Sequence, residues 1–140
     1  MKKYYFVIIL FIAGFVISIS SCKKDDEPQF TESVIKIDSI QHADTVALGS
    51  QLEIKFYGTI GNGCDYFSRY EDIPLDEDEY ANTFKIKIWR KTEGGVACSE
   101  QIKYLDGANL NLSGMLAGNF VIKVAQPDGS FLEGLVFVEE

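Results

Sequence analysis

The sequence contains three cysteines and one histidine, so thiol and imidazole chemistry have few residues available to them. Cys64 and Cys98 follow the N-terminal region, and no Cys-x-x-Cys motif is present. His42 has no spacing relation to either cysteine, which argues against a redox or metal-binding pair. In an exported protein, two such cysteines most simply form a disulfide. Closing a loop of about 35 residues would stabilise a small domain by roughly 3–4 kcal/mol in the chain-entropy model.

The densest charge in the chain is the acidic run over residues 71–79. Several carboxylates on one loop could bind Ca²⁺, which prefers oxygen ligands. Asp76 and Asp78 could be the first two acids of an EF-hand loop. Such a loop would next need a further acid and then glycine, but Tyr80 and Ala81 stand at those positions. The run therefore favours a solvated loop between two strands, and we predict no metal site.

Motifs of catalysis are absent from the sequence: there is no Gly-x-Ser-x-Gly, no His-Glu-x-x-His and no phosphate-binding glycine loop. A hydrolytic triad could only be built on His42, and nothing in the sequence indicates its partners. Carboxylates for glycoside cleavage are plentiful, but so small a domain offers little wall for a cleft. We therefore expect a protein that is not an enzyme and needs no cofactor. The net charge of -8 also argues against a nucleic-acid partner.

Aromatic residues give the only indication of a ligand surface. Strand alternation points Tyr57 and Trp89 away from the core, and Tyr66 begins a cluster with Phe67 and Tyr70. We take Tyr57, Tyr66 and Trp89 as candidate ligand-surface residues, because exposed aromatic rings stack on sugars and are favoured at protein interfaces. The alternative places Trp89 in the core or at its rim, since a one-residue slip near a strand end would turn it inward.

Strand patterns with turns between them fill the chain from about residue 31, and no window shows a helical period. Alternation predicts strands over 33–40, 51–59, 82–91, 96–104, 110–112, 119–125 and 131–139. Residues 48–50 and 127–130 are typical of turns. The predicted inward side chains are Ile35, Ile37, Leu52, Ile54, Phe56, Phe84, Ile86, Ile88, Val96, Cys98, Ile102, Phe120, Ile122 and Val124.

A chain of 140 residues has room for one domain. About seven short antiparallel strands with half-buried patterns predict an all-β sandwich. Residues 118–140, with an alternating strand, Asp128-Gly129 and a second alternating strand, resemble the closing hairpin of immunoglobulin-like domains in secreted bacterial proteins. That resemblance implies an immunoglobulin-like β-sandwich and specifies no function. The alternative is a closed eight-stranded lipocalin-like fold, although the Gly-x-Trp that usually begins one is absent.

The N-terminus has the parts of a secretory signal peptide. Met1-Lys2-Lys3 is basic, residues 4–17 are apolar, and small residues follow. The alternative is a transmembrane anchor, but the apolar stretch is shorter than the ~20 residues that span a bilayer. In either case Lys2 and Lys3 hold the N-terminus inside, so the rest of the chain is expected to be exported.

The sequence Ile19-Ser20-Ser21-Cys22 resembles the lipobox of bacterial lipoproteins, and serine before the cysteine is typical of those from Bacteroidota. The resemblance implies cleavage before Cys22 and acylation of its thiol and new amine, which would anchor the protein in a membrane. The Lys-Lys-Asp-Asp-Glu run that follows resembles the signal for export to the outer face of the outer membrane. We therefore divide the chain into a signal peptide (1–21), a lipidated cysteine with an acidic tether (22–31), and a β-sandwich domain (32–140).

Together these patterns favour a lipoprotein of the outer membrane, exposed at the cell surface, that acts as a non-enzymatic binding or accessory module for a protein or glycan partner. Two more specific hypotheses stay open. A carbohydrate-binding module of a glycan uptake system should display Tyr57 and Trp89 on one flat face. An inhibitor of an extracellular enzyme should present a protruding, ordered loop, for which residues 58–70 are the candidate.

Overall fold

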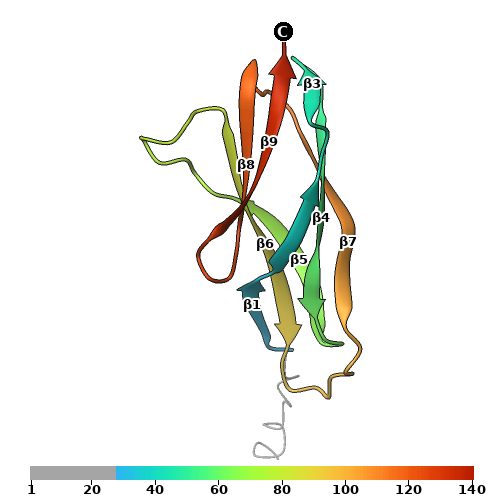
Figure 1. The fold of residues 1–140 in the computed structure, drawn as a ribbon. Coiled ribbons are helices and arrows are strands. Elements are labelled where there is room, and N and C mark those ends of the chain that lie inside the picture. The colour runs from blue at the N-terminus through green and yellow to red at the C-terminus, as the bar shows by residue number, and fades with distance from the viewer. Residues whose placement is uncertain (1–27) are drawn as a thin grey trace, which may run out of the picture.

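The computed structural model describes residues 28–140, which form nine β-strands joined by turns and loops (Figure 1). The strands are β1 (Phe30–Val34), β2 (Lys36–Gln41), β3 (Thr45–Ala47), β4 (Leu52–Gly61), β5 (Asp65–Asp72), β6 (Thr83–Glu93), β7 (Lys103–Leu112), β8 (Gly118–Ala125) and β9 (Phe131–Glu139). No helix within this part of the chain is long and apolar enough to cross a membrane. The prediction of an all-β fold is confirmed.

The strands form two sheets. The larger sheet has the order β1, β6, β8, β9 and β3, with β5 as a further partner of β6, and the smaller has the order β2, β4 and β7. Along one edge of β6, residues 83–86 pair with β8 and residues 89–93 with β1, while β5 occupies the opposite edge. The pairs β6–β8 and β3–β9 are parallel. The prediction of about seven antiparallel strands is therefore wrong in number, since the described residues form nine, and wrong in direction for these two pairs. Strands β6 and β8 can run parallel because β7 carries the chain back through the smaller sheet between them.

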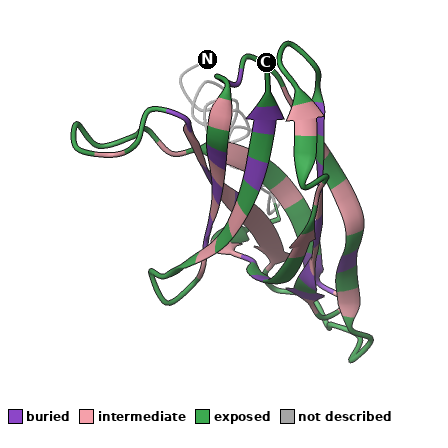
Figure 2. Ribbon diagram, turned by 45° about the horizontal axis from the view of Figure 1, so that its top comes forward, coloured by how far each residue is buried: buried purple, intermediate pink, exposed green. Residues whose placement is uncertain are grey.

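The apolar faces of the two sheets pack against each other to form the core. Ile54 and Phe56 of β4 and Ile86 and Ile88 of β6 are all fully buried. Phe56 also meets Tyr70 of the larger sheet, with ring centres 5.7 Å apart. Figure 2 shows buried and exposed residues alternating along β9, as a sheet with one face on the core requires. The strands predicted over 51–59, 82–91, 119–125 and 131–139 are confirmed.

The segment predicted as one strand over 33–40 is divided between the two sheets. β1 ends at Val34, where it pairs with Trp89 of the larger sheet, and β2 begins at Lys36 in the smaller sheet. Between them Ile35 is buried, and its N–H donates to the Ile88 carbonyl at 2.8 Å. A continuous alternating pattern cannot reveal such a change of sheet, because the inward side chains of both strands enter the same core.

The strand predicted over 96–104 is wrong. Residues 94–102 connect β6 to β7, and Val96, Cys98 and Ile102 are exposed rather than inward. Gly95 has a φ of 78°, a left-handed conformation that ends regular pairing after β6. The short strand predicted over 110–112 is the end of β7, which is longer than its sequence pattern indicates.

Strand β5 has no counterpart among the predicted strands. Its register against β6 shifts between Phe67 and Arg69, which leaves Ser68 as an extra residue. In a regular strand, two residues three positions apart, such as Phe67 and Tyr70, would point to opposite sides. Because of this bulge they point to the same side, and Tyr70 packs against the core. The bulge breaks the period of two on which the sequence prediction depends.

Cys64 and Cys98 form a disulfide, as predicted. Their Cα atoms are 5.1 Å apart, a usual separation for bonded cysteines. The bond joins the turn between β4 and β5 to the connection over residues 94–102. Beside it, the Gly63 N–H donates to the Ser99 carbonyl at 3.0 Å. The long connection is therefore tied to the end of the domain at which β1 begins.

Removing this disulfide should destabilise the domain. The bond closes a loop between residues separated by 34 positions, so the Cys64→Ser/Cys98→Ser double variant should lose about 3–4 kcal/mol of unfolding free energy. Urea unfolding followed by tryptophan fluorescence measures the loss. A reductant should lower the urea midpoint of the wild type and leave that of the double variant unchanged. Equal midpoints for the oxidised wild type and the double variant would contradict a stabilising role.

Candidate binding surfaces

The predicted ligand-surface residues Tyr57 and Trp89 do not share a face. Trp89 lies on the outer face of the larger sheet, since its neighbour Ile88 points into the core. Tyr57 lies on the outer face of the smaller sheet, and its hydroxyl donates to Gln41 Oε1 at 3.0 Å. The core separates the two rings, so the single flat platform expected of a carbohydrate-binding module is not formed.

Trp89 is half-buried beneath charged side chains from both neighbouring strands. The Arg69 guanidinium lies 5.0 Å from the centre of the indole and forms an ion pair with Glu32 of β1. The Ser68 hydroxyl donates to the same carboxylate at 2.7 Å, and Arg69 also contacts Glu71 at 3.0 Å. Hydrogen bonds from Ser68 and Arg69 hold the pKa of Glu32 below its usual value. These contacts restrict access to the indole, which favours the structural interpretation of Trp89.

Tyr66 lies on the same outer face as Trp89, toward the end of the domain where β1 begins. It pairs with Lys91 of β6, and 41% of its surface is exposed. Lys103 of β7 places its Nζ atom 3.8 Å from the centre of the Tyr66 ring. The same ammonium donates to the carbonyl oxygens of Gly63 and Asp65, at 2.7 and 3.0 Å. Tyr66 is therefore the one predicted ligand-surface residue whose ring is both accessible and accompanied by a cation.

The acidic segment over 71–79 is not simply a solvated loop. Its last residue, Glu79, accepts hydrogen bonds from Lys85 Nζ at 2.7 Å and from Lys123 Nζ at 3.4 Å. The Lys85 side chain is only 7% exposed, so its ammonium depends on this carboxylate for compensation. Hydrogen bonds from Lys85 and from the Asp76 N–H lower the pKa of Glu79 to about 2. Among residues 28–140, no three His, Cys, Asp or Glu side chains converge to hold a metal ion.

An apolar strip lies next to this ion cluster on the outer face of β8 and β9. Leu135 is 58% exposed and Phe137 is 50% exposed, and half-buried Val121 pairs with Leu135. We call Val121, Leu135 and Phe137 the β8–β9 face. This face was not predicted from the sequence, although a signal was present: β9 carries large apolar residues on both alternating sets of positions. A strand that is apolar on both faces but covered on only one leaves the second face for another molecule.

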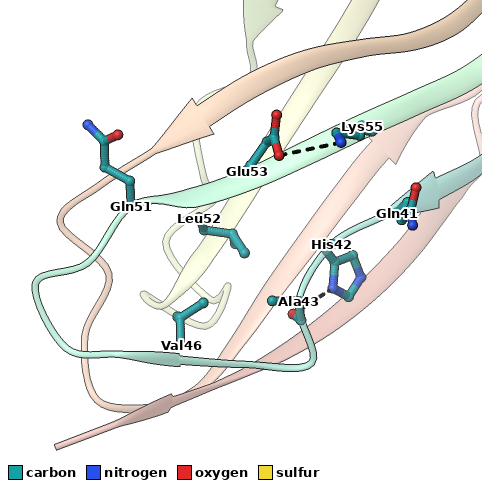
Figure 3. A pocket seen from close by; sticks show the side chains of 8 residues that line it. All are labelled: Gln41, His42, Ala43, Val46, Gln51, Leu52, Glu53 and Lys55. Atoms are coloured by element: carbon teal, nitrogen blue, oxygen red, sulfur yellow. Dashed lines mark hydrogen bonds and ion pairs between the residues drawn. The ribbon is translucent and has the colours of Figure 1, made fainter.

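A hollow of about 400 Å³ lies beside the loop between β2 and β3. Figure 3 shows the side chains that line it. His42 lies on its wall, and the ring Nδ1 is 3.0 Å from the Ala43 carbonyl oxygen. Glu53 and Lys55, two positions apart on β4, form an ion pair with each other at 3.6 Å on one side of the same hollow. Within residues 28–140, no nucleophilic side chain or carboxylate forms a hydrogen bond with the His42 imidazole. The lining therefore offers polar contacts without an arrangement for acid–base catalysis.

Comparisons of this chain with protein-family models, with curated proteins and with solved structures gave no match.

Neutralising Glu79 should destabilise the domain in a pH-dependent way. In the Glu79→Gln variant, buried Lys85 loses its closest anion, so the urea midpoint at pH 7 should fall. Because the pKa of Glu79 is lowered from 4.5 to about 2, its ionised form stabilises the wild type fully above pH 4.5, and this contribution is lost as the pH falls toward 2. The difference between the two midpoints should therefore narrow over that interval.

Urea unfolding at a series of pH values measures this difference. Glu77→Gln is the matched control, because Glu77 is an exposed acid of the same loop. Its midpoint should follow that of the wild type. A difference for Glu79→Gln that stays constant from pH 7 to about pH 2 would contradict the ion-pair explanation.

Proposed function

We propose that this chain is an exported lipoprotein, anchored through Cys22 in the outer membrane and exposed at the cell surface, whose all-β domain binds a protein partner through the β8–β9 face. The observation that carries the binding role is the exposure of Leu135 and Phe137 on one sheet face of a chain with a net charge of -8. Isolated exposed apolar residues are ordinary, but neighbouring large ones on a sheet face are typical of interaction sites.

The lipid anchor rests on sequence motifs that lie outside the described residues. The signal peptide over 1–21 and Cys22 belong to this part of the chain. β1 begins at Phe30, within the range assigned to the tether, so eight positions separate Cys22 from the first strand. The Cys64–Cys98 disulfide supports export, because such bonds form and persist in oxidising compartments.

The proposed role involves neither an enzymatic activity nor a cofactor. In support, the only imidazole of the chain, His42, contacts the carbonyl oxygen of Ala43 in its own loop, and the hollow beside it is lined by both polar and apolar side chains. The strongly lowered pKa of Glu79 has a structural explanation in the cation buried beneath it. A perturbed carboxylate that is fully engaged by lysines is typical of an ion-pair network rather than of an acid catalyst.

We further propose that the fold is a variant of the immunoglobulin-like sandwich. Two sheets around one core and the closing β8–β9 hairpin support this assignment. The parallel β6–β8 pair departs from that family's pattern. The disulfide departs from it as well, because it joins two connections at one end rather than the two sheets across the core.

A protein partner fits the surfaces better than a glycan does. Sugar stacking needs open aromatic faces, and Trp89 lies beneath Arg69 and Glu32. For an inhibitor, the predicted loop over 58–70 is wrong, because these residues form the end of β4, a tight turn and most of β5. The segment that protrudes in Figure 1 is instead the connection from β5 to β6. Its Tyr80 is 57% exposed and would extend the proposed contact area.

The intact mass of the protein extracted from its host membrane tests the anchor. Without reductant, we expect the mass of residues 22–140 plus acyl groups, less two hydrogens for the disulfide. The Cys22→Ala variant should lose the acyl mass and keep the uncut N-terminal segment, because cleavage and acylation both depend on this cysteine. An uncut, unacylated chain would contradict the lipoprotein assignment and favour an N-terminal anchor.

Crosslinking in the host tests the partner surface. A photoreactive amino acid at position 137 should yield a discrete protein adduct, because Phe137 lies at the proposed interface. The control is the same amino acid at position 111, where Asn111 is exposed on the outer face of β7 in the smaller sheet. A Leu135→Lys substitution in the chain labelled at position 137 should abolish the adduct. Equal adducts from both positions, or none from position 137, would contradict the proposal.

A further inference from the structure

Exposed apolar side chains also occur on the segments that meet at the end of the domain where β1 begins. Phe30 is 46% exposed, Val96 48%, Ile102 54% and Tyr104 64%. We call these four residues the basal set. They come from the start of β1, from the connection over 94–102 and from the start of β7.

Backbone contacts place these segments side by side. Phe30 pairs with Glu93 at the end of β6, and the Gly94 N–H donates to the Gln29 carbonyl at 2.7 Å. The disulfide fixes the middle of the connection to the turn between β4 and β5. Figure 1 shows this connection and the end of β6 together at one end of the molecule, opposite the C-terminus.

The basal set does not serve the core of the domain. None of its four residues belongs to the buried cluster or packs against it as a partly buried member. Surface connections are usually polar, yet this one exposes valine and isoleucine on a backbone held by a covalent bond and by hydrogen bonds. An ordered apolar loop is suited to contact with an apolar environment outside the domain.

The position of the tether identifies that environment. The inference rests on the proposed lipid anchor at Cys22. Eight positions to Phe30 span at most about 29 Å even when fully extended, so the end of the domain that begins with β1 is the end nearest the bilayer. Covalent tethering raises the local concentration of this surface at the membrane, so a few apolar contacts suffice for stable seating.

The side chains around the basal set also suit a lipid interface. Lys91 lies with its ammonium 5.0 Å from the centre of the Phe30 ring, and Lys103 stands over Tyr66. Tyrosine rings and lysine stems place apolar surface in the interfacial layer while their polar ends stay hydrated. Glu93 lies beside them, so apolar contact rather than net charge must supply the attraction.

We propose that the basal set rests on the bilayer surface, with Val96 and Ile102 entering the interfacial layer when Cys22 is acylated. The end of the domain that carries the basal set then faces the membrane. In this orientation the C-terminal end of β9, with Phe137, lies at the end of the molecule away from the membrane (Figure 1).

Hydrogen exchange of the acylated full chain tests this orientation. The acylated protein in vesicles of phosphatidylethanolamine and phosphatidylglycerol is compared with the non-acylated mature chain, residues 23–140, in detergent-free solution. We expect amide exchange over residues 94–104 to slow severalfold in the vesicles. The Val96→Asp/Ile102→Asp variant should lose this protection while retaining its acyl mass and its thermal midpoint, because both residues are exposed.

The matched control is Leu135→Asp/Phe137→Asp, which makes the same kind of change on another exposed apolar surface and should keep the protection. A chain without acyl mass would overturn the anchor and with it this orientation. An acylated chain whose 94–104 exchange is unaffected by vesicles would overturn the seating alone. Protection that appears in whole cells but not in protein-free vesicles would overturn the lipid contact in favour of a protein partner at the base.

Discussion

Burial of β6 against β4 is the interaction on which the rest of the structure depends. Ile86 and Ile88 from one strand and Ile54 and Phe56 from the other are fully buried in the same cluster. Each such side chain contributes about 1.5–3 kcal/mol by leaving water, so this contact holds the two sheets together. Among the described strands, β6 alone pairs with three others, which are β1, β5 and β8. Its position therefore determines where most of the larger sheet lies.

Once the inward residues of β6 are fixed, its outward residues must lie on the outer face of that sheet. Lys85 and Trp89 are both covered there, the lysine by Glu79 and the indole by Arg69 with its partner Glu32. These covers come from neighbouring segments and order several long side chains, which costs conformational entropy. No described segment gives similar cover to Leu135 and Phe137 on β9. A sheet that covers a cation and an indole but leaves a leucine and a phenylalanine exposed displays a surface suited to a partner.

The parts of the fold that follow a simple period could be predicted from sequence, and the parts that break it could not. Residues 51–59 alternate without interruption, and the strand and its inward side chains were correctly placed. The bulge at Ser68 hid β5, because one extra residue reverses the facing of everything after it. Residues 96–104 alternate by chance, and the disulfide and the left-handed Gly95 determine their path instead.

The candidate surfaces divide in the same way. The disulfide could be predicted from the sequence, because only Cys64 and Cys98 remain after Cys22 in a chain expected to be exported to an oxidising compartment. The platform of Tyr57 and Trp89 failed because strand alternation gives the side of a sheet but not the sheet to which a strand belongs. The role of Glu79 was hidden for a related reason. Its cations, Lys85 and Lys123, come together only through the parallel pairing of two strands separated by β7.

The disulfide has a consequence for the proposed arrangement that its contribution to stability does not explain. A bond placed between the sheets would stabilise the core, but this one holds a surface connection that exposes Val96 and Ile102 at the end nearest the tether. Apolar side chains on a loose loop would order on contact with lipid at a cost in entropy, whereas on a crosslinked loop most of that cost is met during folding. The same bond leaves the opposite end of the molecule unaffected, where β9 ends. An anchored binding module needs both properties, because its base must settle on the membrane while its partner surface stays clear of it.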